Sequence, residues 1–170
     1  GIIGIGRIGQ AFARIGKAMG MNILAHDEFP PADAAVSDLE VEFTDMDSVF
    51  KRADIISLHC PLTDKTKHLV NSSRLSMMKT DSLLINTSRG PLVDNEALAN
   101  ALNTGQIGGA GLDVLDVEPP PRDNPLLTAA NCLITPHISW YSKASRERLM
   151  DIAVKNLASY IGGNSANVVN

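Results

Sequence analysis

The sequence predicts an α/β fold with a doubly wound parallel sheet in three layers, α/β/α. Three observations lead to this fold class. Short apolar runs, without the polar alternation of a half-exposed strand, recur along the 170 residues, as is typical of parallel strands buried on both faces. Segments with helical spacing separate most of these runs, which indicates right-handed βαβ crossovers. A glycine-rich turn follows the first apolar residues and opens the first helical segment.

The apolar runs place the strands along the chain. A short first strand is expected at residues 1–3, directly before the glycine turn. The later runs are each six to eight residues long, which is within the usual length of a strand. Further strands are expected at residues 22–27, 54–61, 82–88, 109–114 and 131–137.

A helix is expected directly after the glycine turn. Apolar residues recur there at helical spacing, and a glycine stands where a helix of this length would end. These residues are Ile8, Phe12, Ile15 and Met19, followed by Gly20.

Capping residues place the other helices. Thr44 is expected to be an N-cap, with Asp47 three positions later forming a pair like a capping box. Asp94 is expected to cap a helix that ends at Gly105. The helical segments expected are residues 45–53, 71–79, 95–105 and 142–161.

Composition excludes several classes of protein. The net charge of −4 and the pI near 5.5 give no basic surface for nucleic acid or anionic membranes. No apolar run approaches the roughly 20 residues of a membrane-spanning helix, and the first residues do not resemble a signal peptide. Cys60 and Cys132 are too few for a disulfide framework and are expected to be buried free thiols. A soluble, cytoplasmic domain is therefore predicted.

The chain is predicted to hold one sheet-containing domain, residues 1–140, followed by a C-terminal helical segment, residues 141–170. The proline-rich stretch at residues 116–125 is interpreted as a stiff ordered loop rather than a linker.

The glycines at the start of the chain predict a dinucleotide site. Gly4, Gly6 and Gly9 have the G-x-G-x-x-G spacing, and Asp27 follows the next strand 18 residues after the last glycine. Such glycines allow a tight turn, close approach of the pyrophosphate, and close packing of helix on strand. The helix N-terminus favours phosphates, and the Asp27 carboxylate can accept both ribose hydroxyls of NAD. Asp27, with Glu28 beside it, would repel the 2′-phosphate of NADP; the alternative is a structural turn without a ligand.

Three residues after later strands form a candidate catalytic set: Arg89, Glu118 and His137. In open α/β sheets, ligands bind at the carboxyl ends of the strands. Each residue has an ordinary alternative, namely a surface arginine, a solvated loop acid and a strand-end histidine. Their occurrence together, beside a dinucleotide turn, favours catalysis.

This set suits the reduction of a 2-keto acid. Arginine pairs bidentately with a carboxylate, so Arg89 is assigned as the substrate clamp. Histidine is a natural proton donor near neutral pH, so His137 is assigned as the acid/base. A carboxylate on the far imidazole nitrogen fixes the tautomer, so Glu118 is assigned as its partner.

Several motifs together resemble one family. They are "GIGRIG", "HCPLTDKTKHLVN", "MMKTDSLLINTSRGPLVDNEAL", "GAGLDVLDVEPP" and "NPLL…NCLITPHISW", and they are similar to the D-isomer-specific 2-hydroxyacid dehydrogenases, with "TPHISW" most similar to the glycerate dehydrogenase (hydroxypyruvate reductase) branch. The resemblance implies catalytic roles for Arg89, Glu118 and His137 and binding of NAD. It implies NAD contacts at Gly4, Gly6, Arg7, Ile8, Gly9, Asp27, Cys60, Pro61, Thr66, Thr87, Ser88, Arg89, Asp113, His137 and Ser139.

The resemblance also implies what lies outside this chain. Members of the family have an N-terminal substrate domain, so the chain is expected to be a fragment that begins within its first strand, ends near the natural C-terminus and turns over poorly alone. A homodimer and a small 2-hydroxy or 2-keto acid substrate, without nucleic acid or membrane, are implied as partners. His59, Cys60 and His68 are not assigned to a metal, because adjacent strand residues point in opposite directions and the family works without metal. Phosphoglycerate dehydrogenase and an NAD(H)-sensing corepressor remain the alternative functions.

Overall fold

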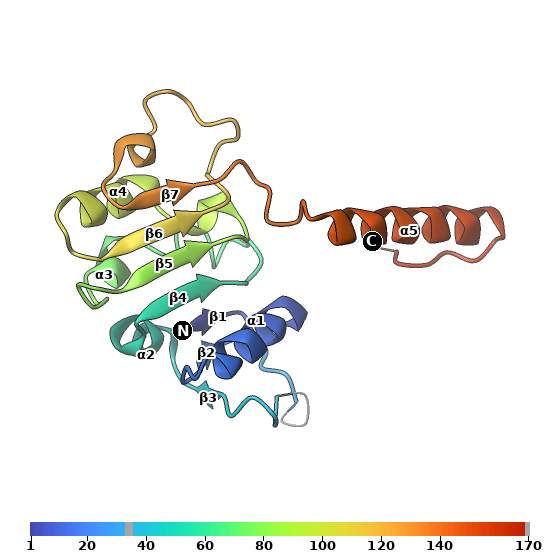
Figure 1. Cartoon of the computed structure of the whole chain (residues 1–170), viewed down its shortest axis with the longest axis horizontal. Helices are drawn as coiled ribbons and strands as arrows, with labels where there is room; N and C mark the ends of the chain where they lie inside the picture. The colour runs from blue at the N-terminus through green and yellow to red at the C-terminus, as the bar shows by residue number, and fades with distance from the viewer. Residues whose placement is uncertain (33–35, 169–170) are drawn as a thin grey trace. The chain divides into compact units, whose positions relative to one another are not determined.

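The computed structural model describes residues 1–32 and 36–168. The chain divides into two units, Gly1–Pro136 and His137–Asn170. In the first unit, the described strands form one parallel sheet in the order β3-β2-β1-β4-β5-β6-β7 (Figure 1). The direction of winding reverses between β1 and β4, which confirms the doubly wound topology. The strands are β1 (Ile2–Ile3), β2 (Leu24–His26), β3 (Glu42–Phe43), β4 (Ile55–Leu58), β5 (Leu83–Asn86), β6 (Gly109–Leu112) and β7 (Cys132–Ile134).

The helices confirm most of the sequence-based expectations. Every predicted helical segment contains a helix, although the one at residues 71–79 is a single turn followed by non-helical chain. The α-helices are α1 (Arg7–Ala18), α2 (Met46–Arg52), α3 (Ser72–Leu75), α4 (Asn95–Asn103) and α5 (Lys143–Ile161), with 3₁₀ turns η2 (Gly90–Leu92) and η3 (Pro125–Thr128).

Two apolar clusters lie on the two faces of the sheet. Ile2 and Ile3 are adjacent in β1 and so point to opposite faces. Ile2 packs in a cluster with Ala13 of α1, whereas Ile3 packs in a larger cluster with residues of α2, α3 and α4, among them Phe50. Helices therefore cover both faces, which gives the predicted three layers.

The apolar stripe of α1 does not face the sheet. The side that packs on β1 consists of Gly9, Ala13 and Gly16, which are buried, because only small residues let a helix come this close to a strand. The predicted helix is confirmed, but its large apolar residues are exposed, with Ile8 at 72% and Ile15 at 60%.

One predicted cap is wrong by one residue. The N-cap of α2 is Asp45, whose carboxylate accepts the backbone N–H of Ser48 at 2.9 Å, and not Thr44. Aspartate is a better acceptor than threonine for the free N–H groups of a first turn. Asp94 caps α4 as predicted, accepting from the N–H of Ala97 at 3.1 Å.

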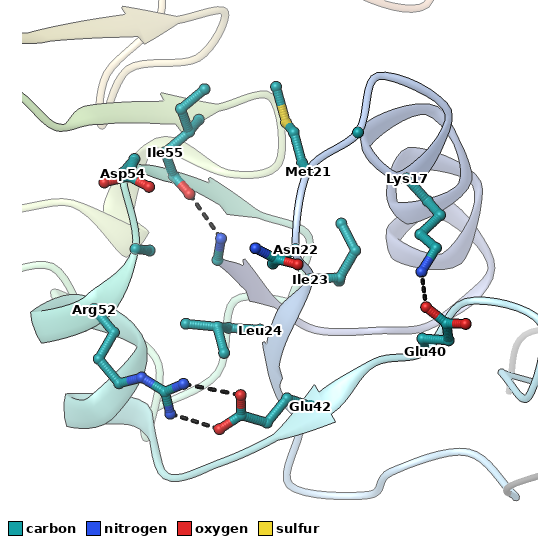
Figure 2. Close-up of a pocket in the computed structure, with 13 residues that line it drawn as sticks. Lys17, Met21, Asn22, Ile23, Leu24, Glu40, Glu42, Arg52, Asp54 and Ile55 are labelled. Carbon is teal, nitrogen blue, oxygen red and sulfur yellow. Dashed lines mark hydrogen bonds and ion pairs between the residues drawn. The ribbon is translucent and has the colours of Figure 1, made fainter.

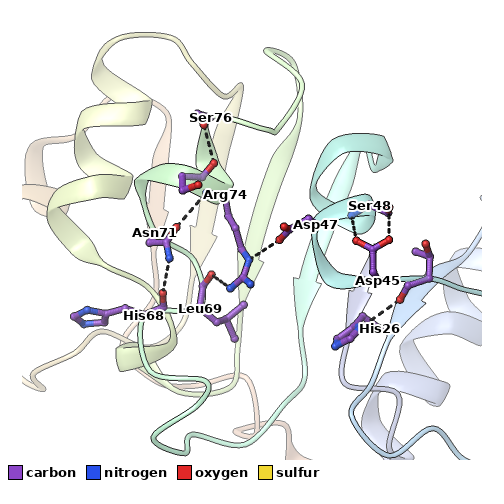
Figure 3. Close-up of polar contacts among 11 residues, drawn as sticks. His26, Asp45, Asp47, Ser48, His68, Leu69, Asn71, Arg74 and Ser76 are labelled. Carbon is purple, nitrogen blue, oxygen red and sulfur yellow. Dashed lines mark hydrogen bonds and ion pairs between the residues drawn. The ribbon is translucent and has the colours of Figure 1, made fainter.

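Arg74 of α3 joins α3 to α2. Its guanidinium donates to Asp47 at 3.1 Å and to the carbonyl oxygen of Leu69 at 2.8 Å (Figure 3). The same group lies 5.9 Å from the ring centroid of Phe50. Hydrogen bonds and a cation–π contact thus fix the helices that cover the face of β4.

The second unit contains α5, which Ser142 caps by accepting the N–H of Ser145 at 3.1 Å. Among residues 1–32 and 36–168, no helix combines the length and the apolar character that a membrane span requires. Residues 169–170 of the expected C-terminal tail lie outside the described residues.

Candidate functional site

The glycine turn after β1 is so tightly packed that a side chain at its first or third glycine would collide with backbone atoms. Gly4 has a φ of +90°, and a Cβ there would lie 2.7 Å from the backbone nitrogen of Cys60. A Cβ on Gly9 would lie 2.2 Å from the carbonyl oxygen of Gly4. The turn is therefore pressed both against the end of β4 and against the first turn of α1.

Gly6 shows the opposite environment. It is exposed, its φ of −67° is ordinary, and no described atom lies within 4 Å of the Cβ that it lacks. Gly6 is also the N-cap of α1, whose first turn contains Arg7 and no acidic residue. An open backbone surface, free N–H groups and a positive helix end fit the pyrophosphate of a dinucleotide.

Asp27 directly follows β2 and holds two loops. One carboxylate oxygen accepts the N–H of Ile5, inside the glycine turn, at 2.7 Å, and the other accepts the N–H of Phe29 at 2.9 Å. Asp27 is half-buried and lies at the end of β2, the strand that pairs with β1. Its carboxylate is therefore at the same edge of the sheet as the glycine turn. A carboxylate accepts several hydrogen bonds at once, so ribose hydroxyls can share it.

Glu28, in contrast, does not act as a second free acid. Its carboxylate pairs with Lys65 at 2.5 Å. The sequence interpretation counted Glu28 as added repulsion toward a 2′-phosphate, but Lys65 compensates this charge. Asp27 is thus the carboxylate at this edge whose hydrogen-bond donors, the N–H groups of Ile5 and Phe29, are uncharged.

The segment after β4 contains three of the candidate NAD contacts, Cys60, Pro61 and Thr66. The hydroxyl of Thr66 donates to the carbonyl oxygen of Pro61 at 2.7 Å and accepts the N–H of Thr63 at 2.7 Å, which closes a compact loop. Burial raises the pKa of the Cys60 thiol to about 11, which favours the neutral thiol. Cys60 and Cys132 are both half-buried free thiols.

The loop after β5 is braced by Asn86, a residue that the sequence reasoning did not select. Its buried amide donates to the carbonyl oxygen of Arg89 at 2.9 Å and accepts the N–H of Ser88 at 3.0 Å. The Ser88 hydroxyl donates to the carbonyl oxygen of Leu58 at 2.6 Å. The loop is thereby fixed, with Thr87 and the Arg89 side chain exposed. A buried amide within an apolar strand was the signal that could have identified Asn86.

Gly90 brings this loop against the loop after β6. A Cβ on Gly90 would lie 1.8 Å from the carbonyl oxygen of Leu115. In that second loop, Glu118 accepts the N–H of Leu115 at 3.0 Å. The loops that carry Arg89 and Glu118 are thus in direct backbone contact.

Asp113 is the first residue after β6 and is 4% exposed. Its carboxylate accepts a hydrogen bond from the Thr135 hydroxyl at 2.5 Å, and its N–H donates to the carbonyl oxygen of Asn86 at 2.9 Å. A buried carboxylate at this edge is a strong acceptor, suited to an amide N–H of a ligand.

His137 opens the second unit, three residues after β7 ends. Its φ is +54°, in the left-handed region, which few residues other than glycine adopt. Ser139 lies two residues further on, in the same segment. The first unit thus presents Arg89 and Glu118, and the second presents His137.

A cavity of about 650 Å³ lies at the other edge of the sheet (Figure 2). It is lined by the amino ends of the central strands, including Gly1, Leu24 and Ile55. Arg52 pairs with Glu42 at 2.6 Å on its rim. Because ligands of open α/β sheets bind at the carboxyl ends, we do not assign this cavity to the cofactor or substrate. No metal-binding group of three His, Cys, Asp or Glu occurs among residues 1–32 and 36–168.

Comparisons with known proteins agree with the observed fold. Residues 1–139 match the family model described as "D-isomer specific 2-hydroxyacid dehydrogenase, NAD binding domain". The chain is 48% identical to a hydroxypyruvate reductase of Blautia hydrogenotrophica, covering 100% of this chain and 52% of that protein. It is 41% identical to a D-3-phosphoglycerate dehydrogenase of Methanocaldococcus jannaschii, covering 100% of this chain and 32% of that protein. A crystal structure of D-lactate dehydrogenase with NAD⁺ from Lactobacillus jensenii superposes with a TM-score of 0.90 at 35% identity, covering 99% of this chain and 54% of that one. The chain spans about half or less of these relatives.

Proposed function

We propose, from the premise that this chain belongs to the D-isomer-specific 2-hydroxyacid dehydrogenase family, that it is the NAD-binding part of an oxidoreductase. The enzyme transfers a hydride between NAD(H) and a short D-2-hydroxy acid or its 2-keto acid. One observation carries this proposal. The absence of a side chain at Gly90 lets the loop that carries Arg89 contact the loop that carries Glu118, at the sheet edge where the dinucleotide turn lies.

The cofactor residues have separable tasks. Gly4 and Gly9 shape the turn, and Gly6, Arg7 and Ile8 receive the pyrophosphate at the N-terminus of α1. Asp27 accepts the ribose hydroxyls, and the loop with Cys60, Pro61 and Thr66 borders the adenosine. The nicotinamide end is assigned to Thr87, Ser88, Arg89, Asp113, His137 and Ser139.

The substrate chemistry falls on three side chains. Bound NADH supplies the hydride. The Arg89 guanidinium binds the substrate carboxylate through its planar fork and orients the keto group. His137 donates a proton to the oxygen that gains charge, and takes it back in the reverse direction. Glu118 is the carboxylate partner that favours the imidazolium form.

Hydroxypyruvate, which is reduced to D-glycerate, is the substrate that we favour, with glyoxylate next. The name of the Blautia relative and the similarity of "TPHISW" to the glycerate dehydrogenase branch support it. 3-Phosphoglycerate is the second candidate, supported by the name of the Methanocaldococcus relative. Its dianionic phosphate calls for extra basic groups, and Lys143 is one of few near the catalytic motifs in the sequence.

The organisation of the whole enzyme is also part of the proposal. Residues 1–140 form the dinucleotide-binding domain, and residues 141–170 form a helical segment that packs on a substrate domain. We further propose that the enzyme is a cytoplasmic homodimer. Size-exclusion chromatography with light scattering would test the dimer, and a mass of one subunit would contradict it.

The decisive experiment is a substrate panel with the full-length protein, NADH and NADPH. Hydroxypyruvate is expected to give the highest kcat/KM, with NADH preferred. In the same protein, His137→Gln is expected to lower turnover by ~10²–10⁴-fold while NADH affinity stays nearly unchanged. A complete lack of turnover with every 2-keto acid, or an equal collapse of NADH affinity in His137→Gln, would contradict the proposal.

A further inference from the structure

Trp140 supports the unusual backbone conformation of His137. A left-handed φ, +54° at His137, is unfavourable for a non-glycine residue, so surrounding contacts must hold it. The indole Nε1–H of Trp140 donates a hydrogen bond to the His137 carbonyl oxygen at 2.9 Å. A second bond, from the N–H of Tyr141 to the carbonyl oxygen of Ile138 at 2.9 Å, closes the same turn.

The indole that makes this bond is itself fixed to the start of α5. The Trp140 ring meets the Tyr141 ring edge-on, with centroids 5.2 Å apart and planes at 87°. The guanidinium of Arg146, in the first turn of α5, lies 4.6 Å from the centroid of the Tyr141 ring. Ser142 caps the same helix. A continuous series of contacts therefore runs from α5 through Tyr141 and Trp140 to the His137 carbonyl.

A carbonyl held in place fixes the peptide plane that follows it. With that plane fixed, the backbone of His137 keeps its left-handed conformation, and the direction in which its Cα–Cβ bond points is set. Proton transfer requires the imidazole nitrogen to be within hydrogen-bond reach of the reacting oxygen, and small misplacements lower the rate strongly.

We propose that Trp140 is a positioning residue that holds His137 in the orientation needed for proton transfer. This inference rests on the acid/base role of His137 proposed above. Trp140 acts through one donor atom and need not touch the substrate. Phenylalanine at this position retains an aromatic ring against Tyr141 but lacks the N–H, so Trp140→Phe isolates the hydrogen bond.

The test uses the full-length protein with NADH and its best 2-keto acid. Trp140→Phe is expected to lower kcat about tenfold, equivalent to ~1.4 kcal/mol of barrier, with KM, NADH affinity and Tm nearly unchanged. In a His137→Gln background, Trp140→Phe is expected to add no further loss, because the group it positions is gone. Lys155→Gln, at an exposed position of α5, is the matched control and is expected to keep the wild-type kcat.

The possible results separate this inference from the proposed function. A wild-type kcat in Trp140→Phe, beside an inactive His137→Gln, would overturn the positioning role alone. A parallel loss of kcat, NADH affinity and Tm in Trp140→Phe would also overturn it, since this indicates general disruption. Near-normal turnover in His137→Gln would overturn the acid/base assignment and the positioning role with it. Additive losses in the double variant would assign Trp140 a contribution independent of His137 and contradict the inference.

Discussion

Gly6 and Gly9 lie three residues apart in one turn, yet alanine should affect them in opposite ways. At Gly9 the added Cβ would meet the Gly4 carbonyl oxygen at 2.2 Å and Ile2 Cγ2 at 3.4 Å. At Gly6 it would meet no described atom within 4 Å. The first substitution tests the fold of the turn, and the second tests whether the open surface binds the cofactor.

The magnitudes follow from these contacts. The atom that obstructs Gly9→Ala belongs to the backbone, so α1 must shift away from β1, and overpacking of this kind costs roughly 1–3 kcal/mol. Each kcal/mol lowers Tm by about 2–4 °C in a protein of 150–250 residues, and by less in the longer full-length protein. Gly6→Ala keeps an allowed φ and clashes with nothing, so its effect on stability should stay within about 0.5 kcal/mol.

The assay combines thermal unfolding with NADH titration, both on the full-length protein. Gly9→Ala is expected to lower both Tm and NADH affinity. Gly6→Ala is expected to keep Tm and to weaken NADH binding by about tenfold or more, because one methyl group keeps a phosphate from the N–H groups of the turn. Gly20→Ala is the control: its φ of +80° makes alanine costly, but Gly20 lies at the far end of α1. It should lower Tm and leave NADH affinity unchanged.

Two outcomes would refute this reasoning. Wild-type NADH affinity in Gly6→Ala would show that the pyrophosphate does not lie over Gly6. An unchanged Tm in Gly9→Ala would show that the helix does not approach the turn as closely as described.

Three further substitutions probe other contacts. Asp27→Asn removes the charge but keeps one acceptor oxygen, so NADH should bind more weakly and the NADH-to-NADPH affinity ratio should fall; an unchanged ratio in paired titrations would contradict the ribose assignment. Burial lowers the pKa of His59, so below about pH 6.5 the unfolded chain takes up a proton that the folded protein resists, and the free energy of unfolding falls. His59→Asn should make the loss of stability between about pH 7 and pH 5 shallower in denaturant titrations, and an equally steep loss would rule out this source. Arg74→Met should lower stability by about 1–3 kcal/mol through loss of its bonds to Asp47 and Leu69, without weakening NADH binding; weaker binding would show that α3 matters to the site.

The sequence was most informative where local chemistry determines structure. The glycine spacing, with Asp27, located a turn in which Gly4 has the positive φ of a tight turn and Gly9 has the predicted close packing of helix on strand. The strands were located by their apolar runs, although β3 was missed. At Glu42–Phe43 it is a two-residue exposed edge strand, and a segment this short produces no apolar run.

Other features depend on partners distant in the chain. The apolar stripe of α1 predicted the helix correctly. Which side of the helix faces the sheet depends instead on how closely the helix packs, because close packing requires the side with Gly9, Ala13 and Gly16. Asn86 looked like an ordinary strand residue until its amide was seen to hold both Ser88 and Arg89. The pairing of Glu28 with Lys65 joins residues 37 positions apart, which spacing alone does not reveal.

The position of the glycine turn between the two apolar clusters has a consequence for folding. The smaller cluster draws on residues 2–41, whereas the larger one draws almost entirely on residues 46–134. Gly4 sits where they meet, against His59 and Cys60. Residues 2–41 can therefore begin to pack together before β4 is available. The turn closes only when the end of β4 reaches Gly4, so NADH should slow hydrogen exchange in β2 and β4 alike.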